Sequence, residues 1–107
     1  MYVQTEETPN PNTMKFLPGK VVSEIGPLEF TNKDQTENKL IIDLLKVEGI
    51  NMVFLGEDFI TVKKDEQKIW KNLKNEIIVL INDYYLGGKD SVIEKKNVKA
   101  KKEEVSD

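Results

Sequence analysis

Residues 50–63 read INMVFLGEDFITVK, two β-rich runs separated by a short turn that contains glycine. The first run spans residues 50–55 and the second spans residues 59–63. Branched and aromatic residues on both sides of a short glycine-containing loop are typical of a β-hairpin. We therefore predict two antiparallel strands here.

One segment of helical periodicity lies on each side of this hairpin. Before it, apolar residues form a stripe from about residue 38 to residue 48. Asn38 or Thr36 can cap the start of this segment, and Gly49 suits its end. After the hairpin, the same periodicity runs from about residue 66 to residue 86. We predict an amphipathic helix in both places.

Three aromatic residues belong to the second helical segment, which Gly87 and Gly88 end. Trp70 and Tyr84 fall on its apolar stripe, so we expect them in the core and not as an exposed binding surface. Tyr85 is offset from that stripe by one position. We expect its edge to face solvent.

Short extended candidates precede the first helix at residues 2–6, 13–17 and 28–31, with prolines and glycines between them. Together with the hairpin and the helices they suggest the order β-β-α-β-β-α. We predict an α+β two-layer sandwich, in which an antiparallel sheet of about four strands carries two helices on one face.

The stretch TPNPNTMKF at residues 8–16 is the most unusual part of the sequence. Its prolines fix φ and its asparagines can close Asx turns, which makes a rigid, polar and outward-facing connection. Two interpretations stay open, a stiff connection that ends strand pairing and a recognition surface. The residues of the partner-binding hypothesis are Thr8, Pro9, Asn10, Pro11, Asn12 and Lys15.

Charge and composition narrow the classes of partner. The 107 residues carry a net charge of −3, and all 16 basic residues are lysine. Without a guanidinium to grip phosphate in a bidentate fork, nucleic acid is not an expected partner. No apolar run is long enough to cross a bilayer, so a membrane is not expected either. Residues 1–88 hold ten lysines against fourteen acidic residues, which predicts an acidic domain.

The chain contains no cysteine and no histidine. Zinc, soft metals and iron–sulfur clusters are normally held by thiolate or imidazole, so we expect no such site within these residues. Nucleophilic catalysis that depends on imidazole is excluded on the same ground. The acidic turn Glu57-Asp58 is too short for a calcium loop. We therefore predict a binding domain without a cofactor of its own, and not an enzyme.

The opening QTEETPNPNTMKF at residues 4–16 resembles the start of Nfu-type (NifU-like) iron–sulfur cluster scaffold proteins. Similar blocks follow in the family's order at VEGI (47–50), VF (53–54), DFITVK (58–63) and, after Trp70, LKNEI (73–77). The resemblance covers about residues 1–88. One departure is Asn75, where many members have proline before Glu-Ile, and it leaves the start of the second helix open.

The resemblance implies an N-terminal domain at residues 1–88, then a flexible linker at residues 89–107 towards a C-terminal Cys-x-x-Cys domain outside this chain. In the family, such motifs from two subunits bridge a 4Fe-4S cluster, which is passed to apo-proteins. The implied partners are iron–sulfur assembly proteins and recipient apo-proteins. The hydrophobic residues of the segment 89–107 are few and sparse, which fits a linker.

Two functions follow from this resemblance. The first is an accessory protein-binding domain that positions the cluster-bearing domain and binds no cluster itself. The alternative is a structural domain for solubility or self-association. The amino terminus is acidic and lacks the apolar run of a signal peptide, so we expect a cytoplasmic location.

Overall fold

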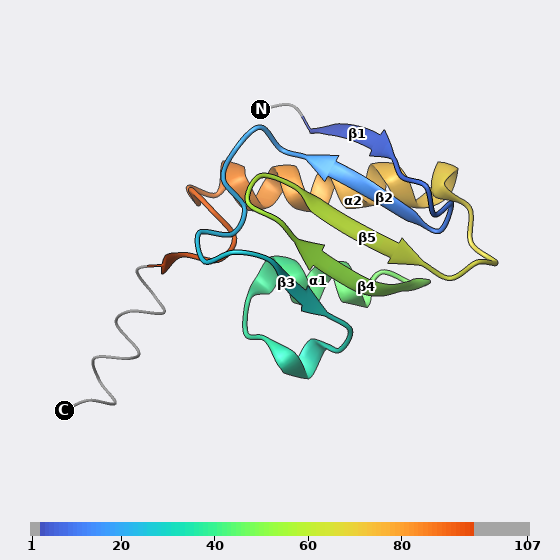
Figure 1. Ribbon diagram of the computed structural model, residues 1–107, viewed down its shortest axis with the longest axis horizontal. Coiled ribbons are helices and arrows are strands. Elements are labelled where there is room, and N and C mark those ends of the chain that lie inside the picture. The colour runs from blue at the N-terminus through green and yellow to red at the C-terminus, as the bar shows by residue number, and fades with distance from the viewer. Residues whose placement is uncertain (1–2, 96–107) are drawn as a thin grey trace.

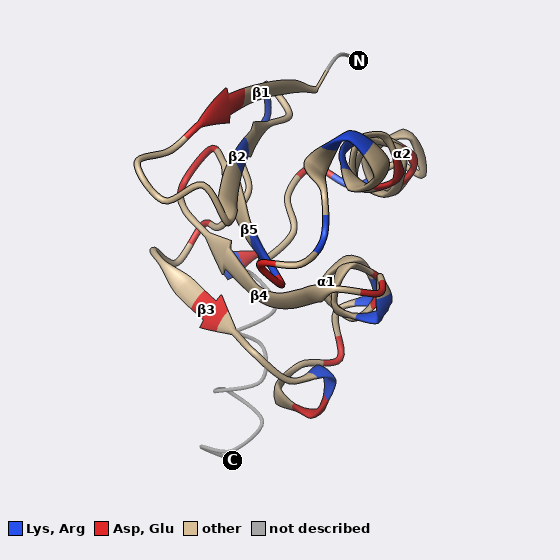
Figure 2. Ribbon diagram, turned by 90° about the vertical axis from the view of Figure 1, so that its right-hand side faces the viewer, with Lys and Arg blue, Asp and Glu red and all other residues tan. Residues whose placement is uncertain are grey.

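The computed structural model describes residues 3–95 (Figure 1). A five-stranded antiparallel sheet has the order β1-β2-β5-β4-β3. Its strands are β1 (Gln4–Glu7), β2 (Thr13–Leu17), β3 (Leu28–Phe30), β4 (Ile50–Leu55) and β5 (Ile60–Lys64). The helical elements are η1 (Lys33–Gln35), α1 (Lys39–Lys46) and α2 (Trp70–Leu86). Both α-helices lie on the same face of the sheet (Figures 1 and 2), which confirms the α+β sandwich.

The sheet has one strand more than the predicted four. The extended candidate near residue 28 is β3, which pairs with β4 from Leu28↔Leu55 to Phe30↔Val53. Although β3 has only three residues, Phe30 is buried in the core. A short edge strand of this kind gives a weak periodic signal in the sequence, but it still covers one side of the hairpin.

The predicted hairpin is β4 and β5, with Val53 opposite Val62 and Leu55 opposite Ile60. All four of these side chains are fully buried, so this register places one apolar face of the hairpin beneath the helices. At the turn, the Gly56 N–H donates to the Phe59 carbonyl oxygen over 2.9 Å.

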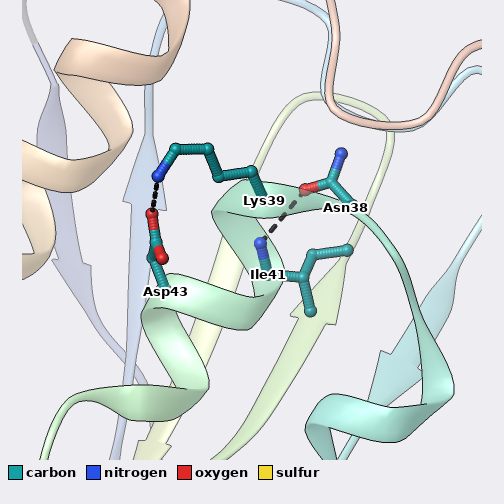
Figure 3. A network of polar contacts seen from close by, with 4 residues as sticks. All are labelled: Asn38, Lys39, Ile41 and Asp43. Carbon is teal, nitrogen blue, oxygen red and sulfur yellow. Dashed lines mark hydrogen bonds and ion pairs between the residues drawn. The ribbon is translucent and has the colours of Figure 1, made fainter.

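The start of α1 confirms one of the two predicted caps. The Asn38 side-chain oxygen accepts a hydrogen bond from the Ile41 N–H over 3.1 Å, as Figure 3 shows. The same figure shows the ion pair between Lys39 and Asp43, one turn apart on α1. Gly49 follows the helix end with φ of +95°, a value that favours glycine.

The second helix begins at Trp70, four residues later than predicted, and Asn75 lies inside it. Residues 65–68 form a turn instead, in which the Lys68 N–H donates to the Asp65 carbonyl oxygen over 2.9 Å. The expectation for Tyr85 is wrong, because its side chain is only 4% exposed. The buried row of α2 follows i, i+4 spacing and consists of Leu73, Ile77, Ile81 and Tyr85.

Packing continues beyond residue 88, where the domain was expected to end. Val92 is 5% exposed, and its N–H donates to the Val22 carbonyl oxygen over 2.8 Å. Ser91 Oγ donates to Glu24 Oε2 over 2.9 Å. The first residues of the expected linker are therefore part of the domain, and residues 96–107 lie outside the described part of the chain. Between residues 3 and 95, neither helix has the length and apolar character needed to cross a membrane.

Candidate partner-binding ridge

Residues 8–12, which we call the ridge, connect β1 to β2. The Asn10 carbonyl oxygen accepts hydrogen bonds from the Thr13 N–H over 3.0 Å and from Thr8 Oγ1 over 2.8 Å. The Asn10 side-chain oxygen accepts a third from the Asn12 N–H over 2.9 Å, which is the predicted Asx turn. The hydroxyls of Thr8 and Thr13 are also hydrogen bonded to each other. Local contacts therefore hold the ridge in one shape.

Trp70 ties the ridge to the first turn of α2. Its indole Nε1 donates to the Pro11 carbonyl oxygen over 2.9 Å. Its ring packs edge-on against Phe16, with ring centroids 6.4 Å apart. The half-buried Trp70 thus has one side in the core, as expected, while its polar edge supports the ridge.

Lys64 supports the ridge from the end of β5. The strand alternation Ile60, Val62, Lys64 turns this lysine towards the helices, and it is only 7% exposed. Its Nζ donates to Asn12 Oδ1 over 3.1 Å, and its backbone N–H donates to the Asn12 carbonyl oxygen over 2.8 Å. The ammonium also lies 5.8 Å from the centroid of the Trp70 ring, within range of a cation–π contact.

The outer surface of the ridge is open to solvent. Pro9, Asn10 and Pro11 are exposed, and Thr8 and Asn12 are half-buried. Ile69, which precedes Trp70 at the start of α2, is an exposed apolar residue with 62% exposure. The outward groups are thus rigid proline rings and an asparagine side chain on a supported backbone, which is a surface suited to contact with another protein.

Lys15 makes its contacts away from the other five residues of the partner-binding hypothesis. It lies on β2 with its side chain on the open face of the sheet, opposite the helices. There its Nζ is 3.8 Å from Glu6 Oε1 and 4.4 Å from the centroid of the Phe59 ring. The structure therefore places Lys15 with β1 and the hairpin turn, and not beside the ridge.

The turn before α2 carries an exposed ion pair. Lys68 Nζ lies 2.6 Å from Glu48 Oε2. This hydrogen bond lowers the pKa of the Glu48 carboxyl below its ordinary value and raises the pKa of Lys68, with a further contribution from direct charge attraction. Because both groups are exposed, the pair fixes the turn more than it stabilises the fold.

A family model described as "Scaffold protein Nfu/NifU N terminal" matches residues 3–88. The chain belongs to this family. Among curated relatives of this Nfu/NifU N-terminal domain, "NFU1 iron-sulfur cluster scaffold homolog, mitochondrial" from Homo sapiens is 41% identical over 88% of the chain. "NifU-like protein 4, mitochondrial" from Arabidopsis thaliana is 34% identical over 100% of the chain. The chain spans 38% of the length of each of these two relatives.

Solved structures agree with the fold of this Nfu/NifU N-terminal domain. The solution structure of a NifU-like protein from Saccharomyces cerevisiae superposes with a TM-score of 0.76 at 29% identity, covering 88% of this chain and 85% of that one. The crystal structure of protein SAV1430 from Staphylococcus aureus superposes with a TM-score of 0.68 at 30% identity. The match covers 76% of this chain and 99% of that one. The α+β architecture is thus shared across these proteins.

The names of the relatives correct the expected location of this Nfu/NifU N-terminal domain. Human and Arabidopsis relatives are named as mitochondrial, so the expectation of a cytoplasmic location is wrong. An acidic amino terminus without an apolar run describes only the residues present in this chain, and it was a poor guide to compartment.

The residues of this Nfu/NifU N-terminal domain do not fit an iron–sulfur cluster. The sequence supplies neither thiolate nor imidazole, the usual ligands of such clusters. Within residues 3–95, no three carboxylates gather closely enough to hold a metal ion.

Sequence reasoning missed the two side chains that support the ridge of this Nfu/NifU N-terminal domain. Strand alternation gave a signal for Lys64, because Ile60 and Val62 set the face on which it also lies. For Trp70 the signal was its indole N–H, which needs a partner when the ring is packed. Neither signal identifies Asn12 or Pro11 as that partner.

Proposed function

We propose that this domain is an accessory protein-binding part of an iron–sulfur cluster scaffold protein, and that the ridge is its contact surface. The proposed partners are iron–sulfur assembly proteins and recipient apo-proteins. Membership of the Nfu/NifU family supports the scaffold role, as does the human relative's name as an iron–sulfur cluster scaffold homolog. The domain acts by contact and not by catalysis.

The observation that carries the proposal is the support beneath the ridge. The Trp70 indole donates to the Pro11 carbonyl oxygen, and Lys64 Nζ donates to Asn12 Oδ1. The Asn10 side-chain oxygen accepts the Asn12 N–H and so closes the turn. A surface that is already ordered loses less conformational entropy when a partner binds. The exposed prolines and asparagine are therefore presented at low entropic cost.

The proposed division of labour rests on the family to which the chain belongs. A cluster needs thiolates, and we propose that a C-terminal Cys-x-x-Cys domain supplies them outside this chain. A linker formed by residues after Ile93 would join the two. By holding a partner at the ridge, this domain raises the effective concentration of that partner near the cluster.

The compartment forms part of the same proposal. Following the names of the relatives, we propose that the protein works in mitochondria. Fractionation of cells that express the full-length protein with a carboxy-terminal tag tests this, and recovery of the tag in the cytosol alone would reject it.

A pull-down with purified iron–sulfur assembly and recipient proteins tests the ridge. The test variant combines Pro9→Ala, Asn10→Ala and Pro11→Ala, which keeps the Pro11 carbonyl that Trp70 contacts. The matched control combines Glu57→Ala and Asp58→Ala in the exposed turn between β4 and β5. We expect the ridge variant to lose binding and the control to keep it, with circular dichroism showing that both are folded.

Equal binding by a folded ridge variant would reject the ridge as the contact surface. Deletion of this domain from the full-length protein tests the accessory role itself. Cluster transfer at an unchanged rate, together with self-association of the domain in sedimentation, would support the alternative of a structural domain.

A further inference from the structure

A second surface feature lies at the opposite end of α2 from the ridge. A pocket of about 600 Å³ opens between the first half of α1, the last turns of α2 and the segment that follows α2. This volume is within the usual range for ligand pockets. Asp83 lies thirteen positions after Trp70 on α2, a rise of roughly 20 Å, so the pocket and the ridge are distinct sites.

The floor of the pocket is apolar and held in place. Leu40 and Val92 are almost fully buried, and Leu80 lines the pocket beside them. Asn38 ties the three walls together: its side-chain oxygen caps α1, and its Nδ2 donates to Tyr84 Oη over 3.1 Å and to the Val92 carbonyl oxygen over 2.9 Å. Figure 3 shows Asn38 at this end of α1.

The rim of the pocket is acidic. Four carboxylates line it, from Glu37, Asp43, Asp83 and Glu94, against the two lysines Lys39 and Lys89, which leaves a balance of −2. Lys39 is already paired, because its Nζ lies 2.9 Å from Asp43 Oδ2 (Figure 3).

The backbone of α2 adds to this negative character. The pocket is lined by Asp83, Tyr84 and Gly87 at the carboxyl end of α2, where the helix carries partial negative charge. The charges along α2 change sign in the same direction, from Lys71 and Lys74 near its start to Glu76 and Asp83 further along. The amino end of α1 also lies here, where the Asn38 side chain accepts the Ile41 N–H.

We propose that this pocket binds a lysine side chain from an extended segment of a partner protein. An alkyl stem over Leu40, Leu80 and Val92 with its ammonium among the rim carboxylates satisfies both parts of the pocket. A metal ion is the poorer match, because no three carboxylates within residues 3–95 come close enough to share one.

Nuclear magnetic resonance titration of the ¹⁵N-labelled full chain tests this site. The probe is the peptide acetyl-Ala-Lys-Ala-Lys-Ala-amide, and the same peptide with glutamate in place of lysine is its control. We expect the lysine peptide to shift the backbone amides of Lys39, Asp83, Gly87 and Val92, more weakly as salt is added. The glutamate peptide should leave them in place.

Two variants sharpen the assignment. Asp83→Asn should weaken binding of the lysine peptide about threefold, the change expected for one solvent-exposed charge pair. Glu29→Gln, an exposed acid on the open face of the sheet, should leave binding unchanged. Absence of shifts at the pocket, or equal weakening by both variants, would overturn the proposal.

The chain's own lysines provide the remaining alternative. Residues 96–102 include Lys96, Lys99, Lys101 and Lys102. If changing these four to glutamine shifts the pocket amides before any peptide is added and then tightens peptide binding, the occupant is this segment and the partner assignment fails. We expect these changes to leave the pocket amides unmoved. The result is independent of the ridge, which the pull-down tests at the other end of α2.

Discussion

The indole nitrogen of Trp70 donates a hydrogen bond to the carbonyl oxygen of Pro11 over 2.9 Å. The two residues are 59 positions apart in the chain, so this contact forms only when α2 docks against the sheet. It therefore couples the shape of the ridge to the packing of the core, through the ring that also contacts Phe16.

Trp70→Phe should lower the free energy of unfolding by about 1 kcal/mol, the net value of one hydrogen bond, while keeping an aromatic ring against Phe16. Urea unfolding followed by circular dichroism measures this change. Trp70→Leu serves as the comparison, because it also removes the ring and should cost more. An unfolding midpoint that is the same for wild type and Trp70→Phe would contradict a supporting role for the indole N–H.

Lys64→Met separates ridge order from global stability. Methionine fills a similar volume without a buried charge, so we expect the free energy of unfolding to change by less than about 1 kcal/mol. The ridge loses the donor to Asn12, and ¹⁵N relaxation should show Asn10 and Asn12 becoming more mobile. Lys63→Met, at the exposed neighbouring position, is the control. It should leave the free energy of unfolding and the mobility of the ridge unchanged. Unaltered relaxation in Lys64→Met would show that the ridge is ordered without the Lys64 contact.

Gly56 lies directly against the Phe59 ring. A Cβ at this position would overlap the Phe59 ring, which also contacts Phe54 and the Lys15 ammonium. Gly56→Ala should therefore destabilise the domain by about 1–3 kcal/mol, the usual cost of overpacking. Gly87→Ala is the matched control, because φ there is −75° and a Cβ would make only ordinary contacts. Thermal unfolding that ranks the two variants equally would contradict this account.

Local sequence signals predicted the hairpin, both helices and the Asn38 cap, because each depends on neighbours within a few positions. What the sequence did not reveal depends on distant partners. Val92 is one of few apolar residues in a polar segment, and its burial depends on the Val22 backbone, about 70 residues earlier. The ridge itself stood out by its prolines and asparagines, but Lys64 and Trp70 reach it only in the folded chain.

The burial of Tyr85 also depends on distant partners, and it gives a pH-dependent prediction. Burial raises the pKa of its hydroxyl well above that of an ordinary tyrosine, with a smaller contribution from Tyr84. The hydroxyl donates to the Val21 carbonyl oxygen over 2.7 Å. At neutral pH, Tyr85→Phe should therefore lower the free energy of unfolding by about 1 kcal/mol.

This difference between wild type and Tyr85→Phe should shrink in alkali. Above the ordinary tyrosine pKa of about 10, Tyr85 loses its proton in the unfolded chain but keeps it in the folded one. The unfolded state then binds fewer protons, so the stability that Tyr85 contributes, complete below that pH, falls as pH rises. Every other titratable group is common to the two proteins, so urea unfolding of the pair from neutral pH to about pH 11 isolates the effect. A difference that stays constant over this range would mean that Tyr85 ionises equally in both states, against its burial in the core.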